Sequence, residues 1–457
     1  MRKFTKILVA VLAIALLLPA VAACQEKAPE VSASPSGPAA PAAPDPVTIT
    51  GWFYPRYVPP GLEPGVYEQQ LIEEYTSIPG NEHVSINFEL IQWDTGPEKV
   101  NVAIATGDAP DFTYDATGRI IGYGVNGALV PLNDLLPASV KNDIPQGIWA
   151  ESSDPAGNIW MLPATMAVVG VGVNRALLRE AGVEDMLPTN ATRTMKSADF
   201  EAMCRALVDA NLEGVLGAFS LYCLNEQGDA AIRNWIANQG ETDFVNSSQT
   251  EIVLNSPGGI AGLQWLYDMY EDGLIVRNPE TNNSLGMLEM FMQSQTPIAT
   301  MFSTGNIAVL TNLILQGDAD PDFDLWFMTL PTPTGTNPKV EVQVIGYCIF
   351  DSGNDARHKA TFDFISWLAE NTDAIASTNQ FAVRNSINMA SIDERYANPE
   401  WQYLAGLGEY VFDVGWSMAN IALIRAEFFP QMQALFTGQK SVEQALNDFV
   451  AAANRTF

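Results

Sequence analysis

Residue types that commonly carry enzyme chemistry are scarce in this sequence of 457 residues. It contains two histidines, His83 and His358, and four cysteines without a CxxC pair or a metal-ligand spacing. Zinc hydrolases and Ser-His-Asp hydrolases both depend on histidine, so these two classes are nearly excluded. The 53 Asp and Glu residues still allow a carboxylate pair that cleaves glycosides, because such pairs have no fixed sequence spacing. An enzyme is therefore possible, but no motif favours one.

Two motif-like stretches have simpler explanations. GYGVNG (122–127) fits the G-x-G-x-x-G pattern of dinucleotide-binding loops, which requires a helix that opens inside it. Pro131 would interrupt such a helix, so we predict a turn beside a strand. GDADPDFDLW (317–326) spaces aspartates as calcium loops do, but Phe323 and Thr329 stand where that loop needs Gly and Glu. We predict that this stretch is a solvated loop that leads into a strand, and a weak cation site there is the alternative. We predict no cofactor and no other metal site.

Aromatic residues at the ends of predicted strands offer a different chemistry. Trp52, Tyr54 and Tyr57 lie around the end of the first strand, Trp93 ends the second, and Tyr114 follows the sequence GDAPDF. Ligands bind at the carboxyl ends of parallel strands in α/β proteins. Aromatic rings suit the apolar faces of sugars, while Asp, Asn and Arg can bond to sugar hydroxyls. Each ring could be a core residue instead, but aromatics at three strand ends favour a ligand site.

Alternating strand and helix patterns must position these residues. Residues 47–53 and 84–93 alternate as strands do, and FTYD (112–115) is strand-like after a Gly107/Pro110 break. Helical patterns occupy residues 66–75, 176–182, 197–211, 259–273, 355–371 and 441–455. This alternation predicts an α/β fold in which parallel sheets are covered by helices.

The N-terminus indicates an exported protein. Residues 1–23 have basic residues, then a short apolar run, then small residues, as a secretory signal peptide does. VAAC (21–24) resembles the bacterial lipobox, in which Cys24 is acylated and anchors the chain to a membrane. Residues 24–46 are rich in Ala and Pro and predict an extended tether. The rest is too long for one typical core, so we expect two domains.

Charge and cysteine usage narrow the partners. The formal net charge is −30 and there is no basic stripe, so nucleic-acid binding is improbable. Besides Cys24 the chain has Cys204, Cys223 and Cys348. An extracellular compartment would permit a Cys204–Cys223 bridge. Because the number of these cysteines is odd, we predict small buried thiols.

Five segments, in this order and spacing, are similar to one known family. They are NVAIATGDAPDF (101–112), NGALVPLNDLL (126–136), GNIWMLPATMAVVGVGVNRALLREAGV (157–183), TPIATMFSTGN (296–306) and VIGYCIFDSGNDARHKATFDFISWL (344–368). The chain resembles the extracellular solute-binding proteins of bacterial ABC importers that take up sugars and oligosaccharides. It looks closest to the lipoprotein members of Gram-positive bacteria.

The resemblance implies a two-lobed periplasmic-binding-protein-like fold. Each lobe would be a mostly parallel sheet covered by helices, and hinge crossover strands would join the lobes. The predicted N-terminal lobe comprises residues 47–165 and 305–373. The predicted C-terminal lobe comprises residues 166–304 and 374–457. The chain would cross near Leu162–Gly172, Thr300–Asn306 and Glu370–Thr378. Gly170 and Gly172 at the first crossing could permit hinge closure, with strand–helix packing as the alternative.

The resemblance also supplies candidate ligand-binding residues between the lobes. They are Trp52, Tyr54, Trp93, Tyr114, Asp115, Arg119, Met166, Phe302, Ser303, Asn306, Tyr347, Arg384 and Trp416. Arg384 stands in FAVRNS, which lacks the proline that relatives often have, so this position departs from the family pattern.

The implied function is that of a monomeric receptor, anchored through Cys24 at the extracellular face of the cell membrane. It would capture a carbohydrate by closing its two lobes and deliver it to the permease subunits of an ABC transporter, without any chemistry. Two alternatives remain at this point. One is a tethered extracellular carbohydrate-active enzyme, and the other is a receptor of the same fold for a peptide or another small solute.

Overall fold

A computed structural model describes residues 44–59, 61–225 and 228–457. The predicted signal peptide, Cys24 and most of the predicted tether lie outside the described residues. Residues 45–457 form one compact unit. None of the described helices is both long enough and apolar enough to cross a membrane.

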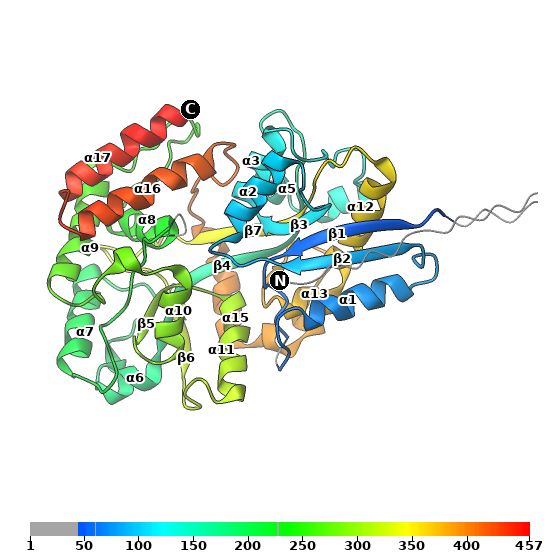
Figure 1. The fold of residues 1–457 in the computed structure, drawn as a ribbon. Helices are drawn as coiled ribbons and strands as arrows, with labels where there is room; N and C mark the ends of the chain where they lie inside the picture. The colour runs from blue at the N-terminus through cyan, green and yellow to red at the C-terminus, as the bar shows by residue number, and fades with distance from the viewer. Residues whose placement is uncertain (1–43, 60, 226–227) are drawn as a thin grey trace, which may run out of the picture. The chain divides into compact units, whose positions relative to one another are not determined.

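The described strands form one eight-stranded sheet with the order β2-β1-β3-β7-β4-β5, and β6 and β8 also pair with β4 (Figure 1). Their bounds are β1 (Val47–Phe53), β2 (Val84–Leu90), β3 (Phe112–Ala116), β4 (Leu162–Asn174), β5 (Ile298–Ser303), β6 (Leu325–Met328), β7 (Glu341–Ile349) and β8 (Phe381–Ala382). β1 pairs in parallel with β2 and β3. All other pairings in this sheet are antiparallel, which corrects the expectation of mostly parallel sheets. The reason is that β5, β6 and β7 run back against β4, the strand that carries the chain away from β1–β3.

β4 connects the two halves of the fold. Its first part, from Leu162 to Val169, pairs with β7, and its second part, from Val169 to Asn174, pairs with β5 and β6. The predicted first crossing coincides with this strand. A Cβ on Gly172 would lie 3.0 Å from the Phe302 Cβ, so close packing accounts for the absence of a side chain there. The register of β4 against β5 shifts between Gly170 and Gly172.

Helices cover the sheet and continue beyond it. The α-helices are α1 (Val66–Ser77), α2 (Gly96–Thr106), α3 (Thr117–Val125), α4 (Ala138–Asp143), α5 (Gln146–Glu151), α6 (Arg175–Glu180), α7 (Ser197–Asp209), α8 (Gly228–Gln239), α9 (Pro257–Glu271), α10 (Ser284–Met292), α11 (Thr304–Gln316), α12 (Asp355–Glu370), α13 (Thr372–Ser377), α14 (Met389–Ile392), α15 (Pro399–Gly406), α16 (Ile421–Phe436) and α17 (Val442–Ala453). Short 3₁₀ turns are η1 (Glu184–Met186), η2 (Pro279–Thr281), η3 (Glu394–Ala397), η4 (Leu407–Tyr410) and η5 (Asn454–Thr456).

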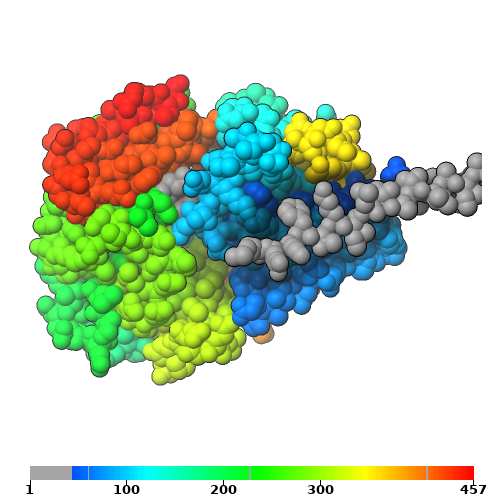
Figure 2. Space-filling model, viewed as in Figure 1, coloured from blue at the N-terminus to red at the C-terminus, as the bar shows by residue number. Residues whose placement is uncertain are grey.

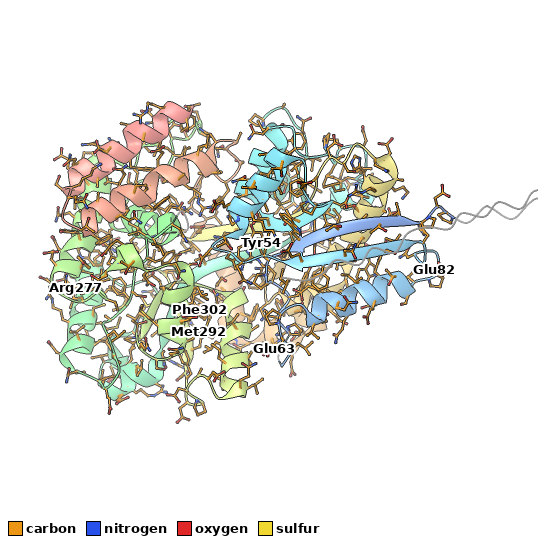
Figure 3. All side chains as sticks on the ribbon, in the orientation of Figure 1. Tyr54, Glu63, Glu82, Arg277, Met292 and Phe302 are labelled. Carbon is orange, nitrogen blue, oxygen red and sulfur yellow. The ribbon has the colours of Figure 1, made fainter. Side chains whose placement is uncertain are left out.

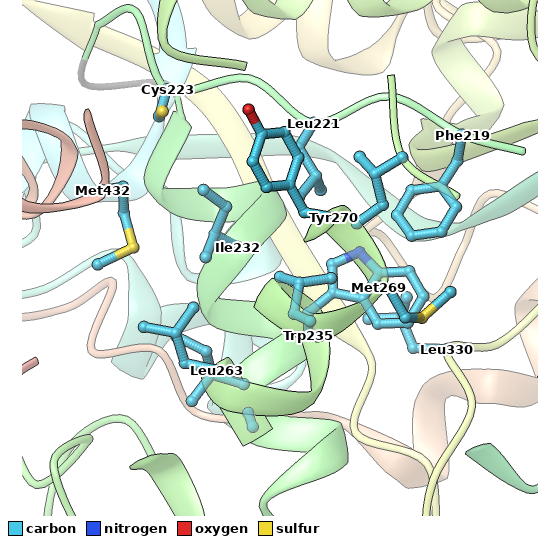
Figure 4. Packing of buried hydrophobic residues seen from close by; sticks show 14 of the residues in the cluster. Phe219, Leu221, Cys223, Ile232, Trp235, Leu263, Met269, Tyr270, Leu330 and Met432 are labelled. Atoms are coloured by element: carbon cyan, nitrogen blue, oxygen red, sulfur yellow. The ribbon is translucent and has the colours of Figure 1, made fainter. Parts of the chain in front are cut away.

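Separate hydrophobic cores lie along the sheet. One core packs β1, β3 and β7 against α12, with Ile49, Phe112 and Phe364 fully buried. Another is built mainly by α7, α8, α9, α16 and α17, where Trp235 of α8 packs near Leu263 of α9 (Figure 4). A smaller cluster surrounds β5 and β6. Distinct cores agree with the expectation of two lobes, while the residue limits of those lobes stay predictions.

Most local expectations are confirmed. Strand 47–53 and helices near 66–75, 259–273 and 355–371 are all present, and the α/β fold class is confirmed. Cys204, Cys223 and Cys348 are free and buried, as predicted. The aspartate-rich loop is exposed and leads into β6, and Asp324 accepts hydrogen bonds from Arg175 and Arg179 at 2.9 and 2.7 Å. No group of carboxylates, histidines and cysteines suited to a metal occurs among the described residues.

The prediction of a turn at GYGVNG is wrong, because Gly122 and Gly124 lie within helix α3. These glycines have packing roles. A Cβ on Gly124 would lie 2.2 Å from the Trp160 ring, and one on Gly122 would lie 3.3 Å from the Ala419 carbonyl oxygen. The missing side chains thus let α3 approach its neighbours closely, and those contacts offset the poor helix propensity of glycine.

Candidate ligand-binding site

Tyr54 and Trp93 meet where β1 and β2 end. Because these strands are parallel neighbours, their carboxyl ends lie side by side and bring the two rings together. The rings stack with centroids 4.0 Å apart and planes 14° apart. Gly96 at the start of α2 makes room for Tyr54, since a Cβ there would lie 2.6 Å from the tyrosine ring.

Asp115 and Arg119 extend this group. Asp115 lies in β3, and Arg119 lies in the first turn of α3. The Arg119 Nε donates a hydrogen bond to Asp115 Oδ2 at 2.7 Å. The guanidinium lies 5.6 Å from the Tyr54 ring centre. Burial by itself would lower the pKa of Arg119, but the Asp115 carboxylate raises it well above its ordinary value. Arg119 therefore stays charged although it is only 8% exposed.

Arg56, which the sequence analysis did not select, completes what we term the N-terminal cluster: Tyr54, Arg56, Trp93, Asp115 and Arg119. Its guanidinium lies 4.4 Å from the Trp93 ring centre. Its Nε is buried and has no hydrogen-bond partner among the described residues. Burial lowers the pKa of Arg56 from its ordinary value.

A second group surrounds Trp416. Arg233 of α8 and Arg425 of α16 lie 5.0 and 5.2 Å from its ring centre. Asp229 of α8 binds both arginines: the Arg425 Nη2 donates to its Oδ1 at 2.9 Å, and Arg233 forms a close ion pair with it. All four residues are at least nine-tenths buried.

Glu341, at the start of β7, belongs to this second group. It accepts hydrogen bonds from the Arg233 Nη2 at 2.9 Å and the Asn234 Nδ2 at 2.6 Å. We term the set the C-terminal cluster: Asp229, Arg233, Asn234, Glu341, Trp416 and Arg425. Burial would lower the pKa of Arg233, but Asp229 and Glu341 raise it. Such buried ion pairs carry a large desolvation cost, so they are weak evidence for added stability.

The two clusters meet at α3. Trp416 packs against Gly118, the residue before Arg119, so closely that a Cβ on Gly118 would lie 2.5 Å from the tryptophan Cε3. The start of α16 lies beside it. On the face shown in Figure 2, the cyan segments around α3 abut the orange segments of α16. Residues from opposite ends of the chain thus form one polar and aromatic region.

Near the two clusters, hydrogen bonds of Asp94 also connect the two predicted lobes. Asp94, just after Trp93, accepts hydrogen bonds from the Asn283 Nδ2 at 2.9 Å and the Ser284 hydroxyl at 3.2 Å. Ser284 begins α10. The carboxylate therefore links the loop after β2 to the α10 N-terminus.

Two cavities lie at or near the C-terminal cluster. A cavity of about 10 Å³ is lined by residues that include Asn234, Thr300 and Glu341. A pocket of about 250 Å³ opens at the surface near Asn238 and Lys339. Sites for small molecules usually enclose roughly 300–1,000 Å³. Both of these cavities are smaller than this range.

Tyr54 of the N-terminal cluster is fully buried. Three further predicted site residues are core residues in this conformation. Tyr114 and Tyr347 are each 1% exposed, and their ring centroids lie 4.7 Å apart. The Tyr114 hydroxyl bonds to Thr165 Oγ1 at 2.6 Å, and the Tyr347 hydroxyl bonds to that of Tyr57. Phe302 is fully buried in the cluster around β5, near α10 and apart from Tyr54 (Figure 3).

The remaining predicted residues make other contacts, although Trp52 packs against the same hydrophobic group as Tyr54 and Trp93. Trp52 contacts Lys99, whose Nζ lies 4.5 Å from its ring centre. Met166 packs at the side of the core of β1, β3 and β7. The Arg384 Nη2 donates to a carboxylate oxygen of Glu370 at 2.8 Å.

Ser303 and Asn306 form the N-terminal cap of α11. The Asn306 Oδ1 accepts from the Ser303 backbone N–H at 2.9 Å and from its hydroxyl at 3.0 Å. This capping arrangement explains both residue types without a ligand.

Two features of the sequence indicate buried charges in the C-terminal cluster. Asp229 and Arg233 are four residues apart, a spacing that pairs charges on one helix face. Arg425 stands in IALIRAEFF, an apolar stretch where a charge needs a buried partner. Neither signal, however, identifies which distant residue completes the group.

Comparisons with known proteins agree with this architecture. A family model described as bacterial extracellular solute-binding protein matches residues 59–375. An ABC transporter solute-binding protein from Thermotoga lettingae, solved with bound α-D-tagatose, has 14% identity and a TM-score of 0.74 over 90% of this chain and 99% of its own. An ABC substrate-binding protein from Listeria monocytogenes in complex with cycloalternan has 18% identity and a TM-score of 0.73 over 90% and 99%.

Two further similarities complete the comparison. A sugar transporter protein from Arthrobacter chlorophenolicus with bound laminaribiose has 15% identity and a TM-score of 0.71, over 90% of this chain and 100% of that one. At such identities the likeness concerns the fold. An uncharacterized lipoprotein from Streptomyces antibioticus is 35% identical over 69 residues, which is 15% of this chain and 15% of that protein.

Proposed function

The chain belongs to the bacterial extracellular solute-binding protein family, and from this premise we propose that it is the substrate-binding component of an ABC importer for a carbohydrate. The ligand would bind between the N-terminal and C-terminal clusters and be released unchanged. Structural neighbours solved with tagatose, cycloalternan and laminaribiose support a saccharide as the ligand.

The observation that carries this proposal is the meeting of the two clusters at α3. Saccharide recognition combines aromatic rings with planar polar groups that bond to hydroxyls. Here Tyr54, Trp93 and Trp416 supply rings, while Asp115, Glu341 and Asn234 are among the polar groups. The two groups lie on elements from different parts of the chain, so a ligand between them would hold both.

Closure around the ligand is part of this proposal, because Trp416 and the residue before Arg119 already lie in close contact. A ligand can shift a conformational equilibrium only through contacts that it makes in one state and not in the other. Contacts to both clusters at once are possible only when their elements are close together. We therefore propose an open form that admits the saccharide and a closed form that the saccharide stabilises.

Location and partners are proposed from the sequence. Acylation at Cys24 would anchor the protein to the extracellular face of the membrane, and residues 24–46 would act as a tether. A monomer in this position could deliver its ligand to the permease subunits. The lipoprotein from Streptomyces antibioticus supports the anchor.

An enzymatic role finds no support at this site. Glycoside hydrolysis usually requires one carboxyl group that holds a proton and a second that is ionised. Asp115, Asp229 and Glu341 are the carboxylates of the two clusters, and each forms an ion pair with arginine. We therefore propose binding without catalysis.

Incubation of the purified protein with a panel of saccharides tests this proposal. The expected result is a higher melting temperature with at least one saccharide, which is recovered intact by chromatography. Cleavage products would contradict the proposal, and so would a melting temperature that no member of the panel raises.

A further inference from the structure

Arg56 carries a positive charge that no carboxylate among the described residues neutralises. Asp115, whose charge acts on Arg56, is already bound by Arg119 through an Nε–Oδ2 hydrogen bond of 2.7 Å. Among the described residues the Arg56 Nε is buried without a hydrogen-bond partner, and the guanidinium lies 4.4 Å from the Trp93 ring centre. A half-buried charge without a partner costs free energy in the free protein. A negatively charged group that binds there would remove this cost.

The rings of the site are already in contact with other groups. Trp93 contacts Tyr54 at 4.0 Å and Arg56 at 4.4 Å. Trp416 has two guanidinium groups within 5.2 Å of its ring centre. A neutral sugar that stacked on these rings would have to displace cation–π contacts, which are stronger when desolvated. The site therefore offers guanidinium groups more readily than bare aromatic faces.

The charge balance of the two clusters is also positive. Four arginines and three carboxylates leave one positive charge: Arg56, Arg119, Arg233, Arg425, Asp115, Asp229 and Glu341. The whole chain has a formal net charge of −30. Most of its surface would repel an anion, whereas the two clusters together with Asp94 beside them have no net negative charge.

We infer that the ligand is an acidic saccharide whose carboxylate is bound by Arg56. This inference rests on the proposed function and narrows its ligand class. A guanidinium can donate two parallel hydrogen bonds to a carboxylate, a geometry that an ammonium cannot reproduce. The carboxylate would replace the missing partner of Arg56 beside Trp93, while the sugar hydroxyls would contact the remaining polar groups.

The test compares uronic-acid disaccharides and trisaccharides with their methyl esters by isothermal titration. Esterification removes the charge and changes little else. At least one acid is expected to bind about tenfold or more tightly than its ester, because charge-assisted hydrogen bonds are the strong ones. Arg56→Gln should abolish this preference and should keep or raise the melting temperature of the free protein. Arg56→Lys should retain part of the preference, since the charge remains.

Arg277→Gln is the matched control. Arg277 also lies over an aromatic ring, 4.7 Å from the Tyr270 centre, but on the exposed side of α9, away from Tyr54 (Figure 3). It should leave the preference unchanged. Equal binding of acid and ester, or a preference that survives Arg56→Gln, overturns the inference, and neutral saccharides that bind would then still uphold the proposed function. If neither acidic nor neutral saccharides bind, the proposed function itself fails.

Discussion

At the scale of single residues, Glu341 is the point on which the C-terminal cluster depends. Its carboxylate is 2% exposed and accepts hydrogen bonds from Arg233, Asn234 and the Gln343 side chain. Arg233 is itself 1% exposed. Removal of one partner of a buried pair leaves the other charge without compensation, which is much more costly than the loss of an exposed pair.

Glu341→Gln should therefore reduce the free energy of unfolding by about 3–5 kcal/mol, as measured by chemical denaturation. Glu89→Gln is the matched control, because Glu89 pairs with Lys99 but its side chain is 52% exposed. That change should stay within about 1 kcal/mol of the parent. Equal effects of the two substitutions would show that the C-terminal cluster is accessible to water and is not a buried network.

Glu151, at the end of α5, gives a pH-dependent prediction. Burial and then the charge of Asp413 raise the pKa of Glu151 to about 7. Between the ordinary value near 4.5 and about 7, the folded protein holds a proton that the unfolded chain has released. Stability conferred by the protonated form is therefore lost as the pH rises through this window. The loss is at most about 3.5 kcal/mol, since one pKa unit corresponds to about 1.4 kcal/mol.

Glu151→Gln should flatten this part of the stability profile and should stabilise the protein at pH 8 relative to the parent. Melting temperatures between pH 4.5 and 8 measure both effects. A variant with the same slope as the parent would mean that Glu151 titrates normally.

At the scale of elements, α3 holds the two clusters in contact because it lacks side chains at the contact points. Gly118→Ala should destabilise the protein by about 1–3 kcal/mol, since its Cβ would lie 2.5 Å from Trp416. It should also weaken saccharide binding, because Trp416 must move away from Arg119. Thermal denaturation and titration with a saccharide that binds the parent measure the two effects.

Two other glycines serve as controls for this prediction. Gly124→Ala should cost stability through Trp160 while the affinity for saccharide changes less, because Trp160 belongs to a different contact of α3. Gly147→Ala in α5 should be neutral or slightly stabilising, since nothing lies within 4 Å of its added Cβ. If all three substitutions had the same effect on affinity, α3 would not act through Trp416.

The same helix shows what the sequence could and could not predict. β1, α1 and β2 follow local hydrophobic periodicity, and their predicted limits agree with the structure to within a few residues. α3 was missed because its glycines oppose a helix locally, and only contacts with Trp160 and Trp416 explain them. Tertiary contacts of this kind are not visible in a local pattern.

The candidate site divides in the same way. Tyr54 and Trp93 could be paired in advance because parallel strands bring their carboxyl ends together. The ion pairs of Arg233 and Arg425 could not, since Asp229 lies 196 residues from Arg425 and any buried acid would have satisfied the same requirement. Tyr114 has the composition of a site residue but is a core residue here, which a single sequence does not distinguish.

At the scale of the whole compact unit, separate cores lie on either side of β4. We therefore expect the two predicted lobes to move relative to each other and not to deform evenly. Packed cores resist compression, so a change in shape concentrates at the connections between them. β4, β5 and β7 are the strands that join these cores. The contacts that would break on opening are then those between the clusters and those of Asp94.

Asp94→Ala tests this motion, because Asp94 bonds to Asn283 and Ser284 across the two predicted lobes. Hydrogen bonds to a charged group contribute about 1.5–3 kcal/mol each, so the closed form should lose at least about 1.5 kcal/mol. Affinity for a saccharide falls in proportion to the population of the closed form, which predicts about tenfold weaker binding. Small-angle scattering should show that ligand reduces the radius of gyration of the parent, and that the variant needs more ligand for the same change. Asp243→Ala removes an exposed ion pair with Lys339 and should alter neither quantity. A radius that is the same with and without bound ligand would mean that the saccharide binds without closure.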